Sequence, residues 1–406
     1  MVHIPIVMAT DNHYEPLVVS LTSLAENAEE ETFYDIYILV DNAFAQDSEN
    51  AVKRHLRKYA RHCSLSFKNV GGIFDNALIS ISHITRPTYF RLAAPDLLNE
   101  DKCIYLDTDT IIMSDLKTLF DASLDDYYVA GVWHPGVVLF DQENIICKNA
   151  GIPDAGQYIN AGVLVMNLKN LRRDKMVKKF LELIPQNMPA QDQDIINHAC
   201  YGKIVFIPLK YNVITKLADQ ELENYKGSYS EEELKEAWNK PCIVHYADQY
   251  KPWNSGNCVF MEQWWRFCRK SPMYECIASD FLGELINNVL YYSHRNSFFT
   301  KNVPKLFDIT FKRKYVIYGA GKRAKEVLSF LRRLGIIPEF IIVSNFEENP
   351  SEIGGIEVRD IASVRRLLRD KSVIIAVRES LHKEIIRNLQ ECDCMELFPL
   401  SDDFKE

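Results

Sequence analysis

Two aspartates, Asp107 and Asp109, follow the apolar run Cys103–Leu106 and precede a second apolar run, Thr110–Met113. Aspartate is unfavourable in strands, and its carboxylate loses much of its solvation when it is buried. A buried strand that ends in two carboxylates therefore needs a cation or hydrogen-bond donors in compensation. Hard divalent ions such as Mg²⁺ or Mn²⁺ take oxygen ligands and also hold substrate phosphates. The alternative is a polar strand end with two solvated or capping aspartates.

The overall composition is typical of a globular protein, since 47% of the 406 residues are hydrophobic and 25% are charged. The length predicts two or three domains. A net charge of −9 argues against nucleic acid as a partner, because no broad basic field would attract a polyanion. Small phosphorylated ligands stay compatible with this charge, since a local site can override it.

The N-terminal residues enter the strand-like run Ile4–Ala9 without the charged segment, apolar core and cleavage site of a secretory signal. No apolar run approaches the roughly 20 residues that a membrane helix needs. The ten cysteines lack metal-ligand spacing, and several lie in apolar runs like small core residues. These features predict a cytoplasmic protein with reduced thiols. Peripheral attachment to the cytoplasmic face of the membrane stays open.

Short β-rich runs alternate with amphipathic helical runs in the N-terminal part. Strands are expected at Ile4–Thr10, Asp35–Asp41, Ser64–Val70 and Lys102–Leu106, and helices at Tyr14–Asn27 and Glu49–Ala60. Strands that alternate with helices pair in parallel and form an α/β sandwich, in which ligands bind at the carboxyl ends of the strands. Polar clusters follow three of these strands, at Thr10–Asn12, Asp41–Asn42 and Asp107–Asp109. This edge of the sheet is therefore predicted to carry the site.

Two more polar clusters come from the middle of the chain. Asn160–Gly162 forms a turn just before a fully apolar strand. Gln191–Asp194 opens an apolar helix, where acidic residues also act as caps, because a helix N-terminus carries unpaired N–H groups. Helix capping is therefore the alternative interpretation of the second cluster.

His245 lies at the end of another predicted strand, and Lys251 follows shortly after it. Asp107, Asp109 and His245 together offer two carboxylates and one neutral imidazole, which leaves positions for phosphate oxygens on a shared cation. The point charge of Lys251 suits a phosphate. A single histidine at a strand end more often satisfies a hydrogen bond than binds a metal, and that alternative stays open.

The C-terminal part contains a basic and aromatic tract, residues 294–314, and then a small Rossmann-like unit. The tract suits either an anionic membrane surface or a linker packed between domains. The turn Gly319–Ala324 follows a strand and opens a helix, so it can hold a phosphate at the helix N-terminus. The next strand ends in Ser344-Asn345, without the acidic residue of a dinucleotide site. Nucleotide binding and a structural or regulatory role both stay open for this unit.

The polar clusters, in this order, resemble the motifs of glycosyltransferase family 8, which has the GT-A fold and includes bacterial lipopolysaccharide galactosyl- and glucosyltransferases. The matching segments are Ala9–Tyr14, Tyr89–Leu92, Tyr105–Asp109, Asn160–Gly162, Gln191–Asp194, His245–Tyr246 and Lys251–Trp253. The resemblance implies an α/β fold with a mixed, mainly parallel central sheet flanked by helices. We expect a GT-A domain at 1–262, a helical and basic-aromatic linker at 263–313 and a small Rossmann-like domain at 314–406.

The resemblance also implies a retaining, metal-dependent transfer of a hexose-type sugar from a UDP-sugar to a glycan, lipid-linked or protein acceptor in cell-surface polysaccharide or lipopolysaccharide assembly. Mn²⁺ or Mg²⁺ would be held by Asp107, Asp109 and His245, while Asp192 and Gln193 would lie at the reacting carbon. The residues expected to contact the donor are Ala9, Thr10, Asp11, Asn12, Tyr14, Arg91, Asp107, Thr108, His134, Asn160, Ala161, Gly162 and Lys251. No carboxylate nucleophile of the kind that retaining glycosidases use is evident, which favours front-face attack assisted by the leaving phosphate.

Two positions depart from the family pattern. His134 stands where the family usually has an aspartate, and a histidine recognises a different set of sugar hydroxyls. This predicts a donor other than plain glucose or galactose. The segment Ala247–Tyr250 lacks the glycine of the family's loop, so its contact to the diphosphate is open.

Two other classes of protein compete with a glycosyltransferase. A sugar-nucleotide-binding regulator or scaffold would have a degenerate transferase site, and intact Asp107, Asp109, His245 and Lys251 argue against it. A nucleotidyltransferase would need a glycine-rich, basic triphosphate loop near the N-terminus, and Ala9–Tyr14 is not such a loop.

Overall fold

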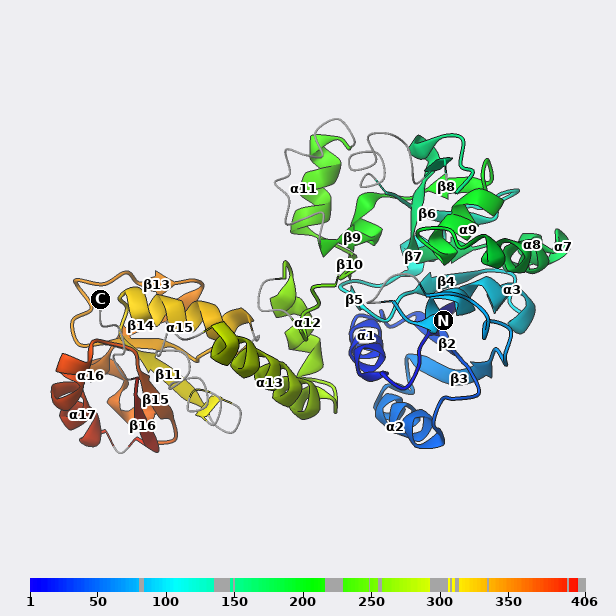
Figure 1. Cartoon of the computed structure of the whole chain (residues 1–406). Coiled ribbons are helices and arrows are strands. Elements are labelled where there is room, and N and C mark those ends of the chain that lie inside the picture. Colours follow the sequence, from blue (N-terminus) through cyan, green and yellow to red (C-terminus); the bar gives the residue numbers. More distant parts are fainter. Residues whose placement is uncertain are drawn as a thin grey trace. The chain divides into compact units, whose positions relative to one another are not determined.

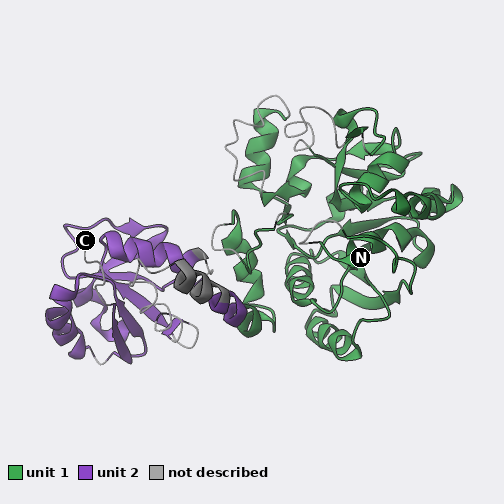
Figure 2. Ribbon diagram, viewed as in Figure 1, with its two compact units in different colours: residues 1–277 green, residues 278–406 purple. Residues whose placement is uncertain are grey.

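The computed structural model describes residues 1–79, 84–134, 147–148, 150–215, 229–247, 249–254, 258–292, 306, 309–310, 314–333, 336–392 and 394–400. These residues form two compact units, Met1–Ile277 and Ala278–Glu406 (Figure 2). The division after Ile277 falls inside the segment that the sequence assigns to a linker, and the finer boundaries stay a prediction. Most of the tract 294–314 lies outside the described residues, so its contact with a membrane also stays a prediction.

A mixed sheet of seven strands lies at the centre of the first unit (Figure 1). In spatial order its strands are β3 (Cys63–Asn69), β2 (Thr32–Val40), β1 (Val2–Ala9), β4 (Cys103–Leu106), β7 (Ile159–Met166), β6 (Val129–Trp133) and β8 (Ile204–Phe206). The β1–β2, β2–β3, β1–β4 and β6–β8 pairs are parallel, whereas β7 is antiparallel to both β4 and β6. The predicted mixed, mainly parallel α/β sheet is therefore confirmed.

Helices cover both faces of this sheet, because its central strands are apolar on both sides. In β1, Ile4, Ile6 and Met8 belong to one buried cluster, and Val7 and Ala9 belong to the other. Near-continuous apolar strands are typical of parallel sheets that are buried on both faces. The first cluster includes residues of α1 (Glu15–Glu26), α2 (Gln46–Leu56) and α4 (Lys117–Phe120). The second includes residues of the 3₁₀ helix η2 (Arg86–Ala93), α3 (Ala94–Leu97), α7 (Leu168–Arg173), α8 (Met176–Leu183) and α9 (Asp192–Ala199).

After β4 the chain leaves the seven-stranded sheet and enters a second sheet, which has three strands. Its strands are β5 (Thr110–Ile112), β10 (Ile243–His245) and β9 (Val213–Ile214), with β10 in the middle. The remaining helices of the first unit are α11 (Glu231–Asn239), α12 (Met261–Cys268) and the start of α13 (Tyr274–Tyr292). Ser20 on α1 hydrogen-bonds Thr110 on β5, with 3.3 Å between the hydroxyls. The second sheet is thereby fixed to the same helix that covers β1.

The second unit has a six-stranded sheet of its own. Its order is β13 (Glu352–Ile353), β14 (Ile356–Asp360), β12 (Ile341–Val343), β11 (Tyr315–Tyr318), β15 (Ser372–Ile375) and β16 (Glu396–Pro399). All neighbours are parallel except the β13–β14 hairpin. Its described residues also form the helical elements α15 (Lys322–Arg333), α16 (Ile361–Val364), η7 (Arg365–Leu368), η8 (Glu379–Leu381), α17 (His382–Gln390) and the larger part of α13. The predicted small Rossmann-like domain is present, with a strand order that reverses between β11 and β15.

Candidate active site

Asp107 and Asp109 lie in the short connection that links the two sheets of the first unit. The backbone N–H of Asp107 donates to the carbonyl of Gly162 on β7 at 2.8 Å. On the other side of the connection, β10 is antiparallel to β5 and places His245 opposite Thr110. The N–H of Tyr246 donates to the carbonyl of Asp109 at 3.0 Å. Strand register therefore brings together two carboxylates and an imidazole that are far apart in the sequence.

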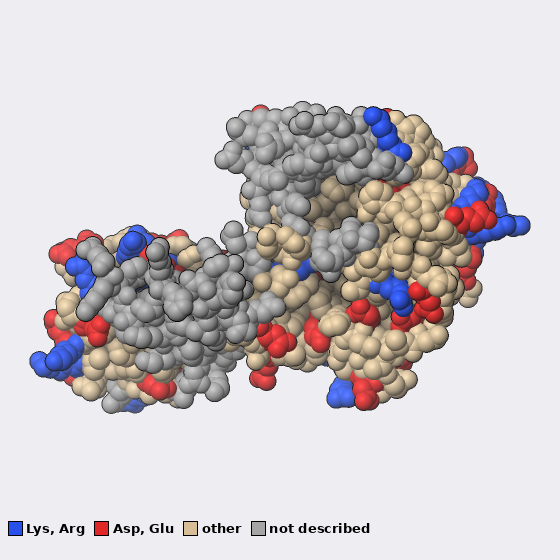
Figure 3. Space-filling view, viewed as in Figure 1, with Lys and Arg blue, Asp and Glu red and all other residues tan. Residues whose placement is uncertain are grey.

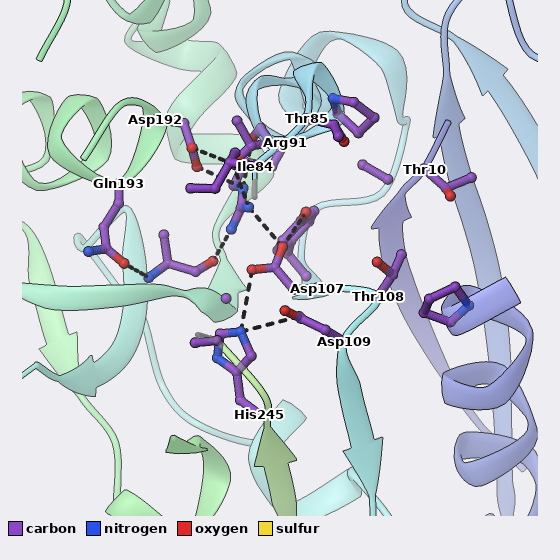
Figure 4. A pocket seen from close by; sticks show the side chains of 18 of the residues that line it. Thr10, Ile84, Thr85, Arg91, Asp107, Thr108, Asp109, Asp192, Gln193 and His245 are labelled. Atoms are coloured by element: carbon purple, nitrogen blue, oxygen red, sulfur yellow. Dashed lines mark hydrogen bonds and ion pairs between the residues drawn. The ribbon is translucent and has the colours of Figure 1, made fainter. Parts of the chain in front are cut away.

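The three side chains point at one another (Figure 4). His245 Nε2 lies 3.3 Å from Asp109 Oδ1 and 3.7 Å from Asp107 Oδ2. One potential ligand atom from each residue lies within 4.8 Å of the other two. This arrangement can place three ligands around one cation.

The remaining carboxylate oxygens are already engaged. Asp107 Oδ1 accepts from Arg91 Nη2 at 2.8 Å and from the Tyr105 hydroxyl at 2.9 Å. Asp109 Oδ2 accepts from Lys251 Nζ at 2.5 Å. Each aspartate thus has one oxygen left for a cation, as a monodentate ligand.

Two observations test whether a divalent cation fits this cluster. Asp109 Oδ1 is buried and has no hydrogen-bond donor among the described residues, which is unfavourable unless a cation compensates it. A Cβ atom at Gly162 would lie 2.1 Å from His245 Cε1 and 2.8 Å from Asp107 Oδ2, so only glycine leaves room for this arrangement. Two carboxylate oxygens and one imidazole nitrogen suit Mn²⁺, Mg²⁺ or Zn²⁺. The residues present therefore fit a divalent ion.

Arg91 connects this cluster to a second carboxylate, Asp192. Its side chain is 4% exposed and lies 2.8 Å from Asp107 and 3.0 Å from Asp192. It also donates to the carbonyls of Thr88 and Ala161. Burial opposes the charge of Arg91, but the two carboxylates outweigh it and raise the pKa of the guanidinium above its usual value. Arg91 thus fixes the carboxylates of Asp107 and Asp192 relative to each other.

The carboxylates of the cluster differ in their acidity. Burial raises the pKa of Asp192 to about 6 despite Arg91 and the Thr88 hydroxyl, which donates at 2.5 Å. Burial also raises the pKa of Asp107. At Asp109, burial raises the pKa, but Lys251 and His245 together outweigh burial and hold the pKa well below its usual range. With a neutral imidazole, three carboxylates face two cationic side chains, and one net negative charge is left for a bound cation.

Gln193 lies on the opposite side of the site from Asp107 and Asp109 (Figure 4). Its Oε1 accepts from Asn160 Nδ2 and from the N–H of Ala161, both at 3.0 Å. The preceding Gln191 has φ +54° and ψ −122°, a conformation that residues other than glycine rarely adopt. Backbone strain of this kind is concentrated at functional sites. The strained turn directs both Asp192 and Gln193 toward the cavity.

A cavity of about 640 Å³ opens in front of these residues, and Figure 3 shows the hollow on this face of the first unit. The predicted residues that line it are Ala9, Thr10, Asp11, Arg91, Asp107, Thr108, Asp109, His134, Asn160, Ala161, Gly162, Asp192, Gln193, His245 and Lys251. Clefts of this size at the carboxyl ends of strands are typical ligand sites. The roles assigned to the individual residues stay predictions.

Two predicted donor contacts do not line this cavity. Asn12 donates to the carbonyl of Ala43 and accepts from the N–H of Ala45, both at 2.9 Å. The Tyr14 ring packs edge-on against Phe44, with centroids 6.4 Å apart. Both residues join the β1–α1 loop to the loop after β2, and this contact gives them a structural role.

Three residues of the site belong to no motif that was recognised in the sequence. Thr88 and Ala190 line the cavity, and Asn212 lies behind it, 2.9 Å from His245 Nδ1. Trp253 also lines the cavity and belongs to the recognised segment Lys251–Trp253. Thr88 stands close in sequence to Arg91, and Ala190 directly precedes Gln191, which is the signal that could have found them. Asn212 had no such neighbour.

A model of the family described as Glycosyl transferase family 8 matches residues 5–257. This is more than half of the chain, so the chain belongs to this family and is an enzyme of the hexosyltransferase class. The prediction from sequence is confirmed at this level. The second unit lies outside the match.

Individual relatives agree with the family. General stress protein A of Bacillus subtilis is 25% identical over 255 residues, which are 61% of this chain and 86% of that protein. The lipopolysaccharide 1,2-glucosyltransferase of Escherichia coli K12 is 30% identical over 179 residues, which are 42% of this chain and only 50% of that enzyme. The galactosyltransferase LgtC, solved in complex with donor and acceptor sugar analogs, has a TM-score of 0.56 at 25% identity, covering 66% of this chain and 96% of LgtC.

No helix among the described residues is both long enough and apolar enough to cross a bilayer. Contact with a membrane surface is a separate matter and stays a prediction.

Proposed function

We propose that the protein is a metal-dependent, retaining glycosyltransferase that moves a hexose-type sugar from a UDP-sugar to an acceptor in cell-surface polysaccharide or lipopolysaccharide assembly. The observation that carries this proposal is the convergence of Asp107, Asp109 and His245, each with one ligand atom turned inward, beside the ammonium of Lys251. Divalent ions with such ligands normally also hold substrate phosphates.

The chemistry needs a leaving diphosphate whose negative charge is stabilised. When bound at this site, Mn²⁺ or Mg²⁺ would act as a Lewis acid on the diphosphate oxygens. Lys251 Nζ lies 2.5 Å from both Asp109 Oδ2 and the carbonyl of Tyr246, so it is already held beside the ligand cluster. There it would add a second positive charge to the leaving group, and stabilisation of this kind is typically the largest catalytic contribution.

The sugar would lie between the aspartates and the wall formed by Asp192 and Gln193. We propose that Asp192 orients sugar hydroxyls, because its carboxylate is fixed by Thr88 and Arg91 at 2.5 and 3.0 Å. Asn160 and Gly162 also line the cavity, and they lie inside β7, so the turn that the sequence predicts before this strand is not present. His134 also lines it and would recognise hydroxyls that an aspartate does not, which favours a donor other than plain glucose or galactose.

Retention would follow from attack on the face that the diphosphate leaves. The described carboxylates of Asp107, Asp109 and Asp192 are each paired with a cationic side chain, and both lone pairs of Gln193 Oε1 accept hydrogen bonds. None of these groups has the freedom of a covalent nucleophile. In the proposed step the bond from the anomeric carbon to the diphosphate breaks, the acceptor oxygen bonds that carbon, and the hydroxyl proton passes to the leaving phosphate.

The test is release of UDP from a panel of UDP-sugars, with Mn²⁺ and with EDTA in its place. GDP- and dTDP-sugars serve as controls for the nucleotide. Mn²⁺-dependent turnover of at least one UDP-sugar is expected, and it should be absent from the Asp107→Asn variant. Binding of UDP-sugars without any turnover would instead favour the alternative, a sugar-nucleotide-binding regulator or scaffold.

The acceptor class follows from the proposed assembly role. A carbohydrate or glycolipid acceptor is expected, on the cytoplasmic side of the membrane, where the sugar nucleotide is available. Binding to vesicles that contain anionic lipid, with and without residues 294–314, tests peripheral attachment. Loss of binding with the tract would support it, and equal binding would exclude the tract as the anchor.

A further inference from the structure

A buried row of amide side chains connects the segment Asn160–Gly162 of β7 to His245. Asn212 is fully buried and lies between the 3₁₀ helix Leu209–Tyr211 and β9. Its Oδ1 is 2.9 Å from His245 Nδ1, and its Nδ2 donates to Asn160 Oδ1 at 2.8 Å. Asn212 therefore joins this part of β7 to a residue of the ligand cluster.

The backbone fixes the direction of these hydrogen bonds. The N–H of Gly162 donates to the side chain of Asn160 at 2.9 Å, so the atom that faces it must be an oxygen. The same Asn160 oxygen faces Asn212, which must therefore present its NH₂ group there. An amide has one oxygen and one NH₂ group, so the oxygen of Asn212 faces His245. A ring nitrogen that faces an acceptor must carry the hydrogen, and that nitrogen is Nδ1.

The other end of the row is fixed in the same way. The N–H of Ala161 donates to Gln193 at 3.0 Å, and Asn160 Nδ2 donates to the same Gln193 oxygen. The backbone N–H groups of Ala161 and Gly162, both in β7, thus determine the direction of three side-chain amides. These amides belong to Gln193, Asn160 and Asn212. The last member of the row determines the tautomer of His245.

The tautomer matters because either ring nitrogen of a neutral imidazole can carry the hydrogen, and Nε2 of His245 also faces an acceptor. With hydrogen on Nε2, the ring would donate toward Asp109 Oδ1, which lies 3.3 Å away, and would occupy the space between the aspartates. With hydrogen on Nδ1, the Nε2 lone pair is directed into that space. Only the second form can ligate a cation.

We propose that Asn212 is a positioning residue that holds His245 as the Nδ1–H tautomer and so keeps the cluster competent for a divalent cation. The inference deepens the proposed function and depends on it for the identity of the site. Groups that orient ligating histidines typically change metal affinity by 10- to 100-fold when they are removed.

The first experiment observes the tautomer directly in the metal-free, full-length protein. Two-dimensional NMR of the ¹⁵N-histidine-labelled chain distinguishes protonated from unprotonated ring nitrogens, and the His245→Gln variant assigns the signal. Hydrogen on Nδ1 is expected. Hydrogen on Nε2 in the wild-type protein would overturn the proposal, and this measurement does not depend on any variant of Asn212 folding.

The second experiment measures Mn²⁺ affinity by calorimetry, with the metal alone and with UDP. Asn212→Leu removes the acceptor and is expected to weaken Mn²⁺ binding by about 10- to 100-fold. Asn212→Asp keeps an oxygen toward Nδ1 and should bind Mn²⁺ more tightly than Asn212→Leu. Asn170→Leu is the matched control, because Asn170 is also buried and hydrogen-bonded, to the carbonyls of Asp125 and Tyr127, but lies outside the cavity.

The outcomes separate the two proposals. A folded Asn212→Leu protein with wild-type Mn²⁺ affinity would overturn the role of Asn212 and leave the proposed function intact. A loss of affinity equal to that in Asn170→Leu would also overturn it, because general destabilisation would then explain the effect. A wild-type protein that binds no Mn²⁺ would contradict the proposed function, while the NMR measurement would still decide the tautomer.

Discussion

Both units of the chain contain parallel strands whose carboxyl ends meet at one edge of a sheet, but the two sets of strand ends differ. In the first unit, Asp107, Asp109 and His245 turn charged or ligating atoms toward a cavity of about 640 Å³. In the second unit, Gly319 packs against Val377, where a Cβ would lie 2.7 Å from the valine side chain, and Arg323 donates to the carbonyl of Val377. The sheet topology brings strand ends together in both units. The active site differs from the other set of strand ends because its largely buried carboxylates border a cavity.

The largest expected effect comes from removing a ligand carboxylate in the first unit. Asp109→Asn should lower kcat/KM by about 100- to 1000-fold, because the cation and Lys251 both lose their partner. Asp360 is the matched control, since it also ends a parallel strand, and its carboxylate caps α16 by accepting the N–H of Ala362 at 2.8 Å. Asp360→Asn keeps that cap and should leave turnover unchanged. A comparable loss of kcat/KM in both variants would show that the strand ends of the first unit are not special for turnover.

Gly162 in β7 and Gly321 in the turn after β11 should respond differently to alanine. Gly162→Ala would place a methyl group 2.1 Å from His245 Cε1, so we expect Mn²⁺ affinity and turnover to fall by about 100-fold, near the upper end for a disturbed metal site. At Gly321 a Cβ would meet nothing within 4 Å, and Gly321→Ala should change stability by less than about 1 kcal/mol. Metal titrations and melting temperatures check both expectations. An unaffected Gly162→Ala protein would mean that His245 does not occupy the described position.

Replacing an arginine by lysine should also have different effects on stability in the two units. Arg91→Lys removes the planar contacts to Asp107 and Asp192 within a buried site, and it should destabilise the first unit by about 3 kcal/mol. Arg323→Lys in the second unit affects a part-buried hydrogen bond to one carbonyl, and about 1 kcal/mol or less is expected. Urea denaturation of each variant measures the difference. Equal destabilisation would show that the ion pairs at Arg91 contribute nothing specific.

The smallest expected effect is a dependence of turnover on pH. Burial raises the pKa of Asp192 to about 6, so this carboxyl is protonated below that pH and ionised above it. Because ionised Asp192 pairs with Arg91 and would orient the sugar, kcat at saturating Mn²⁺ and donor should fall about tenfold per pH unit below 6. Asp192→Asn should show low activity without this acidic limb. An identical limb in that variant would assign the titration to another group.

Much of the site could be predicted because apolar runs fix the strands that carry it. The run Cys103–Leu106 is buried on both sides and places Asp107 and Asp109 at its end, and the strand before His245 acts in the same way. Side-chain direction could not be predicted so well. Asn12 and Tyr14 share the loop of Asp11 but bond and pack against the loop after β2, which depends on tertiary contacts.

Residues that position another side chain of the site could not be predicted from the sequence. Asn212 has no motif of its own, and its importance comes from a hydrogen bond to His245 across the fold. Thr88 is similar, since its hydroxyl fixes Asp192, which lies far away in the sequence. The first contact depends on the pairing of β9 with β10, and the second depends on the packing of α9 against η2. Spacing along the chain does not contain that information.

The most direct test of the account is anomalous diffraction from crystals grown with Mn²⁺ and UDP. We predict one manganese peak at about 2 Å from Asp107 Oδ2, Asp109 Oδ1 and His245 Nε2, with the diphosphate completing its coordination. An ordered UDP with no manganese between the aspartates, or with the imidazole turned away from them, would contradict the account.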